Sequence, residues 1–350
     1  MGFRDRFQNL KESVGQWAEN KSSNSLDNRI EKNLAEMEAG SEIERTAAIK
    51  ALVIQAQTDE KWLEPILNSF MRVLPNQLAS PQEAIIDALV DLKNKNPSFE
   101  TKILESIQST LDSPYPSVRT KIIQIWTNLA LKSDAKSSET IADLFEMLSD
   151  DDTDVRYQTQ ESLSKILHSI PKSALPELKQ ALRDDDWRVV YHSIVILTKF
   201  AKKHPGPCTS LAPEVVTAFN SGDRLKERAA DCIGILGLAD PISVKGAVPG
   251  LIQGLESKSS ELRKSSATAI GRIGSKDAMV VFHAIPKLAK VLKNEDWYVH
   301  IEVLKALGYI GSNKPTLVKP HLALIRNKTT TGAERNICDA AKWALKKAGG

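Results

Sequence analysis

Residues 266–274 read SATAIGRIG in one-letter code, and a closely similar phrase, VLKALGYIG, returns 37 positions later at residues 303–311. A third copy, AADCIGILG, occupies residues 229–237. In each copy the apolar residues recur every three or four positions, which is the period of an α-helix. Related helical phrases at a constant spacing predict a tandem array of α-helical repeats.

Glycine returns at two fixed places in the three copies. The first glycine falls in mid-helix, where glycine costs about 1 kcal/mol relative to alanine, so its recurrence predicts close packing against a neighbouring helix. The last glycine is the residue type that often ends a helix in the left-handed conformation, and we interpret it as a C-cap. The mid-helix set is Gly234, Gly271 and Gly308, and the C-cap set is Gly237, Gly274 and Gly311.

Another apolar helix precedes each of these phrases, and a polar turn joins the two. The last large apolar residue of this first helix recurs at spacings of 37, 34, 37, 36 and 37 residues, the period of a helical hairpin. These residues are Leu111, Leu148, Leu182, Phe219, Leu255 and Leu292. Degenerate copies on both sides bring the total to about nine hairpins. Because one hairpin cannot bury its apolar face alone, the hairpins are expected to stack.

The turns between the helices carry two further signals. Acidic and Ser or Thr residues precede the second helices and supply N-cap acceptors. The clusters at residues 150–154 and 184–186 lack the glycine and the closing glutamate of a helix-loop-helix calcium loop, so capping is favoured over a metal site. After several turns Val or Leu is followed by Arg, as at Arg119, Arg156 and Arg263, whereas Val190 and His300 stand at the arginine position elsewhere.

This pattern resembles HEAT repeats, particularly the short variety of phycobilisome-lyase-like proteins, over residues 26–348. The resemblance implies an all-α fold, namely an α-solenoid forming a right-handed superhelix whose second helices line the concave side. Such a surface suits large or extended partners. The sequence names no residue that would handle a chromophore, so a lyase activity is not expected.

Composition and cysteine usage limit the class of protein. Apolar residues make up 41% and charged residues 26% of 350, with 17 Gly and 16 Pro, which excludes a disordered or collagen-like chain. The three cysteines, Cys208, Cys232 and Cys338, are odd in number and far apart, which offers neither a disulfide framework nor a zinc knuckle. The amino terminus lacks the apolar core of a signal peptide. We therefore expect a cytoplasmic protein.

Charge is divided unevenly along the chain. Residues 1–240 carry 29 basic and 36 acidic side chains, whereas residues 241–350 carry 18 and 8. The basic third would suit a nucleic acid, an anionic membrane or an acidic protein, or it is an uneven solvated surface. Candidate partner-binding residues on the second helices are Arg263, Lys264, Arg272, Lys305, Arg335, Lys342, Lys346 and Lys347. A separate row on a first helix, expected to face another side, comprises Lys287, Lys290 and Lys293.

Residues 1–20 predict an amphipathic helix ahead of the array, followed by a polar linker at residues 21–25. Its apolar stripe has helical spacing and comprises Phe3, Phe7, Leu10, Val14 and Trp17. The helix either caps the exposed end of the first repeat or docks on a membrane surface or a partner protein. Its mixed charge weakens the membrane alternative.

Sequence signals for catalysis are poor. The six histidines are scattered without a His-Glu dipeptide or a metal-binding pair, and no phosphate loop or nucleophile elbow occurs. We therefore expect no cofactor and a non-enzymatic scaffold that binds another macromolecule, most readily a protein. A nucleic-acid-binding solenoid, a membrane-recruited scaffold and a HEAT-like DNA glycosylase remain alternatives. Trp187 and Trp297 occupy equivalent turn positions, either to pack on the next repeat or to anchor a partner.

Overall fold

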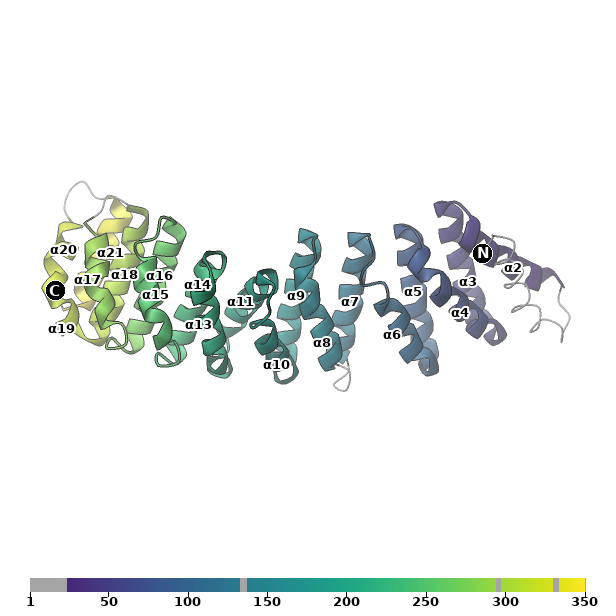
Figure 1. Cartoon of the computed structure of the whole chain (residues 1–350), viewed down its shortest axis with the longest axis horizontal. Coiled ribbons are helices and arrows are strands. Elements are labelled where there is room, and N and C mark those ends of the chain that lie inside the picture. Colours follow the sequence, from purple (N-terminus) through teal and green to yellow (C-terminus); the bar gives the residue numbers. More distant parts are fainter. Residues whose placement is uncertain (1–23, 133–136, 294–296, 330–333, 350) are drawn as a thin grey trace. The chain divides into compact units, whose positions relative to one another are not determined.

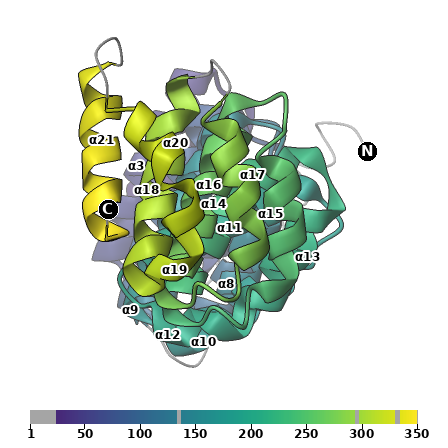
Figure 2. The ribbon, with the colours of Figure 1, turned by 90° about the vertical axis from the view of Figure 1, so that its left-hand side faces the viewer.

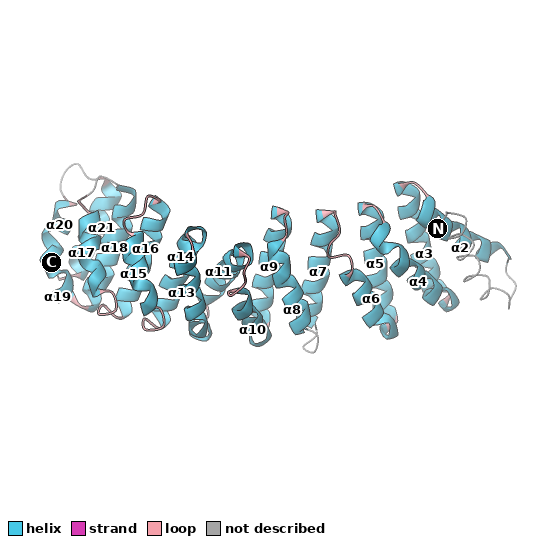
Figure 3. Ribbon diagram, viewed as in Figure 1, coloured by secondary structure: helices cyan, strands magenta, loops and turns pink. Residues whose placement is uncertain are grey.

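A computed structural model describes residues 24–132, 137–293, 297–329 and 334–349. Every element in these residues is a helix (Figures 1 and 3). The chain divides into two compact units, Met1–Ile125 and Trp126–Gly350, and the division falls within α7 (Pro116–Lys132). The predicted stack of helical hairpins is confirmed in each unit. None of the described helices is both long and apolar enough to span a lipid bilayer.

The amino-terminal unit begins with hairpins of nearly antiparallel helices. Its helices are α2 (Asn24–Ala39), α3 (Glu42–Thr58), α4 (Leu63–Val73), α5 (Ala79–Lys95), α6 (Glu100–Gln108) and the first part of α7, with 3-10 turns η1 (Glu60–Trp62), η2 (Leu74–Asn76) and η3 (Pro97–Phe99). The second helix α3 packs on its partner α2 and on the next second helix, α5. Phe70 of α4 and Leu89 of α5 are fully buried and belong to the core of this unit.

The carboxyl-terminal unit repeats the same hairpin. Its first helices are α8 (Ser137–Glu146), α10 (Pro171–Ala181), α13 (Ala212–Ser221), α15 (Val248–Gly254), α17 (Ile285–Val291) and α20 (Leu322–Asn327). Its second helices are α9 (Thr153–Ser169), α11 (Trp187–Ala201), α14 (Asp223–Ala239), α16 (Ser260–Lys276), α18 (Trp297–Asn313) and α21 (Arg335–Lys347). Seen from the end of this unit, α13, α15 and α17 lie beside the layer formed by α14, α16 and α18 (Figure 2).

Proline interrupts the first helices of this unit. A short helical turn precedes four of them. These turns are α12 (Pro205–Cys208) with η5 (Thr209–Leu211) before α13, η6 (Lys245–Ala247) before α15, η7 (Phe282–Ala284) before α17, and α19 (Pro315–Val318) with η8 (Lys319–His321) before α20, whereas η4 (Met147–Ser149) follows α8. Pro213, Pro249 and Pro286 each stand in the first turn of the helix that follows. Proline is tolerated there because the first amide of a helix has no intrahelical acceptor. The chain therefore bends at these sites and restarts a helix.

The second helices pack directly on one another, α14 on α16, α16 on α18 and α18 on α21. The mid-helix glycines make this possible, as predicted. A Cβ atom added at Gly234 would lie 2.8 Å from the Cα of Ala269, and one at Gly271 would lie 2.7 Å from the Cα of Ala306. At Gly308 the added atom would meet the Trp343 ring. Neighbouring backbones therefore approach more closely than any side chain would allow.

The C-cap interpretation of the trailing glycines is wrong. Gly237, Gly274 and Gly311 lie inside their helices, which continue for two more residues, and Gly349 alone has a positive φ among the described residues. A Cβ at Gly237 would lie 2.5 Å from Ile273 Cγ1, and one at Gly274 would lie 2.5 Å from Ile310 Cγ1. Both sets of glycine therefore serve helix packing, because positions three apart lie close together on one helical face.

Side-chain capping begins several second helices. The Asp152 carboxylate accepts from the amides of Asp154 and Val155, and Asp186 accepts from the Arg188 amide at 2.8 Å. In the amino-terminal unit, Ser41 and Glu44 form a reciprocal capping box. The acidic clusters therefore act as predicted, as acceptors for amides that have no partner within the helix. No group of His, Cys, Asp and Glu in the described part of the chain is placed to hold a metal ion.

Where an arginine follows the turn, as at Arg119, Arg156 and Arg263, it closes that same turn. Arg156 Nη1 donates to the carbonyl oxygens of Asp150 and Asp151, the latter at 2.9 Å. Arg119 Nη1 donates to the Ser113 carbonyl at 2.6 Å. In each case the acceptor lies five or six residues earlier, in the turn that follows the preceding first helix. The recurring Val-Arg signature is thus a contact within one repeat.

Candidate partner-binding groove

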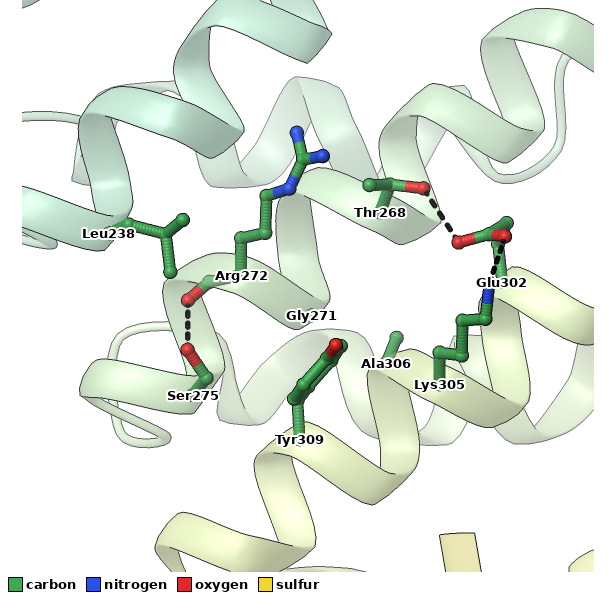
Figure 4. A pocket seen from close by; sticks show the side chains of 9 residues that line it. All are labelled: Leu238, Thr268, Gly271, Arg272, Ser275, Glu302, Lys305, Ala306 and Tyr309. Atoms are coloured by element: carbon green, nitrogen blue, oxygen red, sulfur yellow. Dashed lines mark hydrogen bonds and ion pairs between the residues drawn. The ribbon is translucent and has the colours of Figure 1, made fainter. Parts of the chain in front are cut away.

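Two neighbouring cavities open on the second-helix layer of the carboxyl-terminal unit. The first, about 330 Å³, is lined by Leu238, Thr268, Gly271, Arg272, Ser275, Glu302, Lys305, Ala306 and Tyr309 (Figure 4). The second, about 290 Å³, is lined by Val195, Thr198, Lys199, Lys202, Arg228, Asp231, Ile235 and Arg272. We call the two cavities together the second-helix groove. Arg272 lines both, so it stands at the centre of the groove.

Arg272 takes its place from the glycine beside it. Gly271 lets α16 approach the backbone of α18, and on the other side Arg272 lies close to Gly234 of α14, where an added Cβ would stand 3.3 Å from Arg272 Cδ. Among the described residues, no hydrogen-bond or ion-pair partner is found for the Arg272 guanidinium, which in Figure 4 extends away from Glu302 and Tyr309. A guanidinium is always charged and carries five N–H donors. The groove therefore presents a full positive charge with its donors available.

Of the other basic side chains that line the groove, some already have a partner within the chain. On α18, Lys305 Nζ lies 2.9 Å from Glu302 Oε1. On α14, Arg228 Nε donates to the hydroxyl of Tyr191 at 3.2 Å, and this bond raises the arginine pKa. Lys202 lies just after α11, is exposed and has no described partner.

Positive charge exceeds negative charge in the groove. Its lining holds five basic side chains, Lys199, Lys202, Arg228, Arg272 and Lys305, and two acidic ones, Asp231 and Glu302. Lys199 donates to Glu161 Oε1 at 2.5 Å and thereby holds the pKa of that carboxyl below its usual value. The excess cations would attract an anionic group.

Apolar side chains separate these charges. Val195, Ile235 and Ala306 form part of the lining, and Leu238 and Tyr309 remain 37% and 41% exposed. A surface that combines an available arginine with exposed Leu and Tyr is typical of protein-binding sites, where aromatic residues and arginine contribute most of the binding energy.

The structure brings together only two of the predicted partner-binding residues, Arg272 and Lys305. Arg263 lies on the same helix as Arg272 but closes its own turn, since its Nη1 donates to the carbonyls of Ser257 at 2.6 Å and Lys258 at 3.1 Å. It lines a different cavity of about 380 Å³.

Lys264 is engaged with its neighbours on the next repeat. Its Nζ lies 3.2 Å from the Tyr298 hydroxyl, which in turn donates to Glu261 at 2.7 Å, and the bond to Tyr298 raises the lysine pKa. The predicted residues of α21, which are Arg335, Lys342, Lys346 and Lys347, are exposed and line neither cavity.

The lysine row of the first helix α17 was expected to face another side than the second-helix residues, which holds for Arg272 and Lys305 but not for Arg263. Lys287 Nζ lies 2.6 Å and Lys290 Nζ 3.4 Å from Glu256 Oε1, and they line the cavity that Arg263 also lines. The contact with Lys287 lowers the pKa of the Glu256 carboxyl. None of the residues that line this cavity lines the second-helix groove.

Sequence analysis missed Lys202 and Arg228 because both lie in the acidic part of the chain, where a count over 240 residues hides local charge. The sequence does contain a signal for Arg228. Relative to the repeated mid-helix glycine, Arg228 stands six residues before Gly234 of its helix, and Arg272 stands one residue after Gly271 of the next helix. These two positions of the repeat are seven residues apart, nearly two helical turns, so they lie on the same face of a second helix. Aligning the copies on their glycines would have placed both arginines in one groove.

Trp187 makes contact with the following repeat. Its ring lies under the Arg224 guanidinium at 4.9 Å and remains 44% exposed. Arg224 belongs to the first turn of α14, so this contact joins two repeats, as one of the two interpretations expected. The Trp297 side chain and the predicted docking residues Phe3, Phe7, Leu10, Val14 and Trp17 lie outside the described residues.

Comparison with known sequences gives one family. The sequence pattern of the HEAT repeats matches residues 103–198 and 248–328, which is half of the chain. No curated protein matches the sequence significantly.

Solved structures with similar folds share little sequence. A crystal structure of an engineered protein is 20% identical, with a TM-score of 0.51 over 59% of this chain and 98% of its own. A second engineered protein is 18% identical, with a TM-score of 0.50 over 60% of this chain and 96% of its own. The crystal structure of Kap121p bound to Nup53p is 14% identical, with a TM-score of 0.60 over 99% of this chain, which spans 42% of that protein. These likenesses concern the fold alone.

Proposed function

The chain belongs to the HEAT-repeat family, and we propose that it is a non-enzymatic cytoplasmic scaffold that binds another protein in the second-helix groove of its carboxyl-terminal unit. Fold alone does not fix function, so the proposal depends on the site. The observation that carries it is Arg272, which lines two adjacent cavities and has no described partner. An unpaired guanidinium between exposed apolar side chains is a surface that a protein partner would complete.

Two further observations support this proposal. Kap121p, whose fold is similar, was crystallised with a protein, Nup53p, which makes a protein the better-supported class of partner. Cys208, Cys232 and Cys338 are all free thiols, which fits a reducing compartment. Burial raises the pKa of Cys208 to about 11, so this thiol is held in its unreactive protonated form.

Site-specific photo-crosslinking tests the proposed function. A benzophenone amino acid replaces Leu238, which lines the groove, or Lys293, which is exposed beyond α17 and outside the groove. The full chain is irradiated in its native cell extract, and the crosslinked proteins are identified by mass spectrometry. We expect a defined protein to be captured from position 238 and to be absent from position 293. Capture of the same proteins from both positions, or of none from position 238, would contradict a groove-bound partner.

A further inference from the structure

Resting on the proposed function, the geometry points to one class of partner: we propose that the second-helix groove binds an extended acidic segment of a protein. In this segment a Glu or Asp side chain pairs with Arg272, and apolar side chains lie about three residues before and after it. The chemistry and spacing of the groove support this assignment.

The carboxylate is assigned from the chemistry of Arg272. A guanidinium forms two parallel hydrogen bonds with a carboxylate, a geometry that few other groups match. Lys202 and Lys305 lie in the flanking cavities and reinforce the positive potential. Asp231 lines one cavity together with Lys202, and in the other cavity Glu302 lies 2.9 Å from Lys305, so the groove does not form an uninterrupted row of cations. A phosphate backbone, with a negative charge at every nucleotide, would meet these carboxylates at close range.

The apolar flanks are assigned from the repeat. The residue that follows the mid-helix glycine is Ile235 in α14, Arg272 in α16 and Tyr309 in α18. Three consecutive second helices thus present an apolar, a basic and an aromatic residue at one equivalent position. All three line the groove, and Leu238, which follows Ile235 by three residues on α14, lines the cavity of Tyr309 together with Ala306.

The spacing follows from helix packing. Neighbouring helices lie about 8–10 Å apart. An extended chain in the polyproline II conformation advances about 3.1 Å per residue and completes a turn in three residues, so side chains three positions apart lie on one face. A segment that crosses the second helices therefore moves from one helix to the next in about three residues. When its acidic side chain reaches Arg272, the residues three positions away reach the Ile235 and Tyr309 flanks. An α-helical segment rises only about 1.5 Å per residue and would present this pattern over twice as many residues.

Selection of peptides from a random library tests the assignment. Phage displaying random 12-residue segments are selected on the immobilised full chain, and enriched sequences are synthesised with a fluorescent label for anisotropy titrations. We expect enrichment of Glu or Asp with apolar residues about three positions away. Because a hydrogen bond to a charged group contributes about 1.5–3 kcal/mol, Arg272→Glu is expected to weaken binding tenfold or more.

A matched variant separates the effect of losing Arg272 itself from the effect of changing the net charge of the protein. Lys276→Glu makes the same charge change four residues further along α16, at an exposed residue outside the groove lining. We expect this variant to bind the peptides within about twofold of wild type. A peptide with Lys in place of its Glu is expected to recover binding to Arg272→Glu. Circular dichroism of both variants checks that the helices remain folded.

Other outcomes would overturn the inference. These are enrichment of segments without an acidic residue, binding that is equally weakened by both variants, no enriched segment at all, and a single-stranded 20-nucleotide DNA probe that binds more tightly than any peptide and depends on Arg272. The crosslinking experiment at position 238 does not depend on the sequence of the partner. It would still support a protein scaffold if the acidic pattern failed.

Discussion

Gly271 of α16 lies so close to Ala306 of α18 that an added Cβ atom would stand 2.7 Å from the Ala306 Cα. Real Cβ atoms do not approach backbone atoms this closely, so the two helices would have to separate. Since this contact lies beneath Arg272, it also fixes the position of the groove.

Gly271→Ala is expected to lower the free energy of unfolding by about 1–2 kcal/mol. Overpacking typically costs about 1–3 kcal/mol, and the better helix propensity of alanine returns up to about 1 kcal/mol. Urea unfolding followed by circular dichroism measures the change. Gly206→Ala is the control, because a Cβ there would have no neighbour within 4 Å. Equal effects of the two substitutions would show that the close approach does not limit stability.

Arg183→Ala is expected to cost about 1–2 kcal/mol of stability through Glu214. The Glu214 side chain is only 5% exposed, accepts from Arg183 Nη2 at 2.6 Å, and has Lys179 Nζ at 3.6 Å. Its other oxygen, Oε2, is buried without a described partner. Removing the arginine leaves a buried carboxylate poorly compensated.

A double-mutant cycle with Glu214→Gln tests the origin of that cost. The neutral amide does not need a cation, so Arg183→Ala is expected to cost less than about 0.5 kcal/mol in the Glu214→Gln background. Urea unfolding of the four proteins gives the coupling energy. Strictly additive effects would mean that Arg183 stabilises the fold independently of Glu214.

Stability is expected to fall in acid partly because of His192. Burial, assisted by the charge of Arg156, lowers its pKa from 6.5 to about 4. Its Nδ1 lies 2.8 Å from Gln160 Oε1. Between these two pH values the unfolded chain binds a proton that the folded state excludes, so the free energy of unfolding decreases as the pH falls.

His192→Gln removes this proton uptake. Unfolding titrations of wild type and variant at pH 7, 6, 5 and 4 measure the difference in stability. We expect the difference to shift in favour of the variant below about pH 6.5 and to level off near pH 4. Carboxylates that titrate in the same range affect both proteins and cancel. Parallel stability curves would show that His192 titrates normally in the fold.

Arg263 is expected to contribute to stability and not to partner binding. Arg263→Ala removes the donor that satisfies the Ser257 and Lys258 carbonyls and is expected to cost about 1–2 kcal/mol in urea unfolding. Arg263→Lys keeps the charge but loses the fork of donors, so it is expected to recover less than half of that loss. In the peptide titrations both variants should match wild type. Weaker peptide binding with an unchanged free energy of unfolding would show that Arg263 takes part in partner binding.

The two arginines of α16 show how far sequence reasoning extends. Arg263 and Arg272 were both expected on a partner-binding surface, yet they lie nine residues apart, about two and a half turns, and so on opposite sides of the helix. That separation is readable from spacing alone. Which side faces the neighbouring turn and which faces the groove depends on how α14 and α18 pack, and sequence spacing does not contain this information.

The glycines show a similar limit. Their recurrence revealed close packing at Gly234 and Gly271, because a glycine in mid-helix has an energetic cost that must be offset. The same residue type at Gly237 and Gly274 was interpreted as a helix end. The helices instead end two residues further on, before Asp240 and Asp277, whose carboxylates accept from the amides of Ile242 and Met279. Residue type alone does not separate the two uses of glycine.

The turn carbonyls that accept from Arg156 and Arg263 belong to the same repeats as these arginines, so closing the turn needs no neighbouring repeat. A hairpin that contains both the arginine and the turn carbonyls that it contacts is a self-contained structural module. Splicing out one such module at matching points, or inserting a duplicate, would leave no turn carbonyl abandoned. The array could in this way lengthen or shorten by whole modules during evolution, while the contacts between repeats, such as those of Gly271 with Ala306 and of Trp187 with Arg224, would have to form again at the new junction.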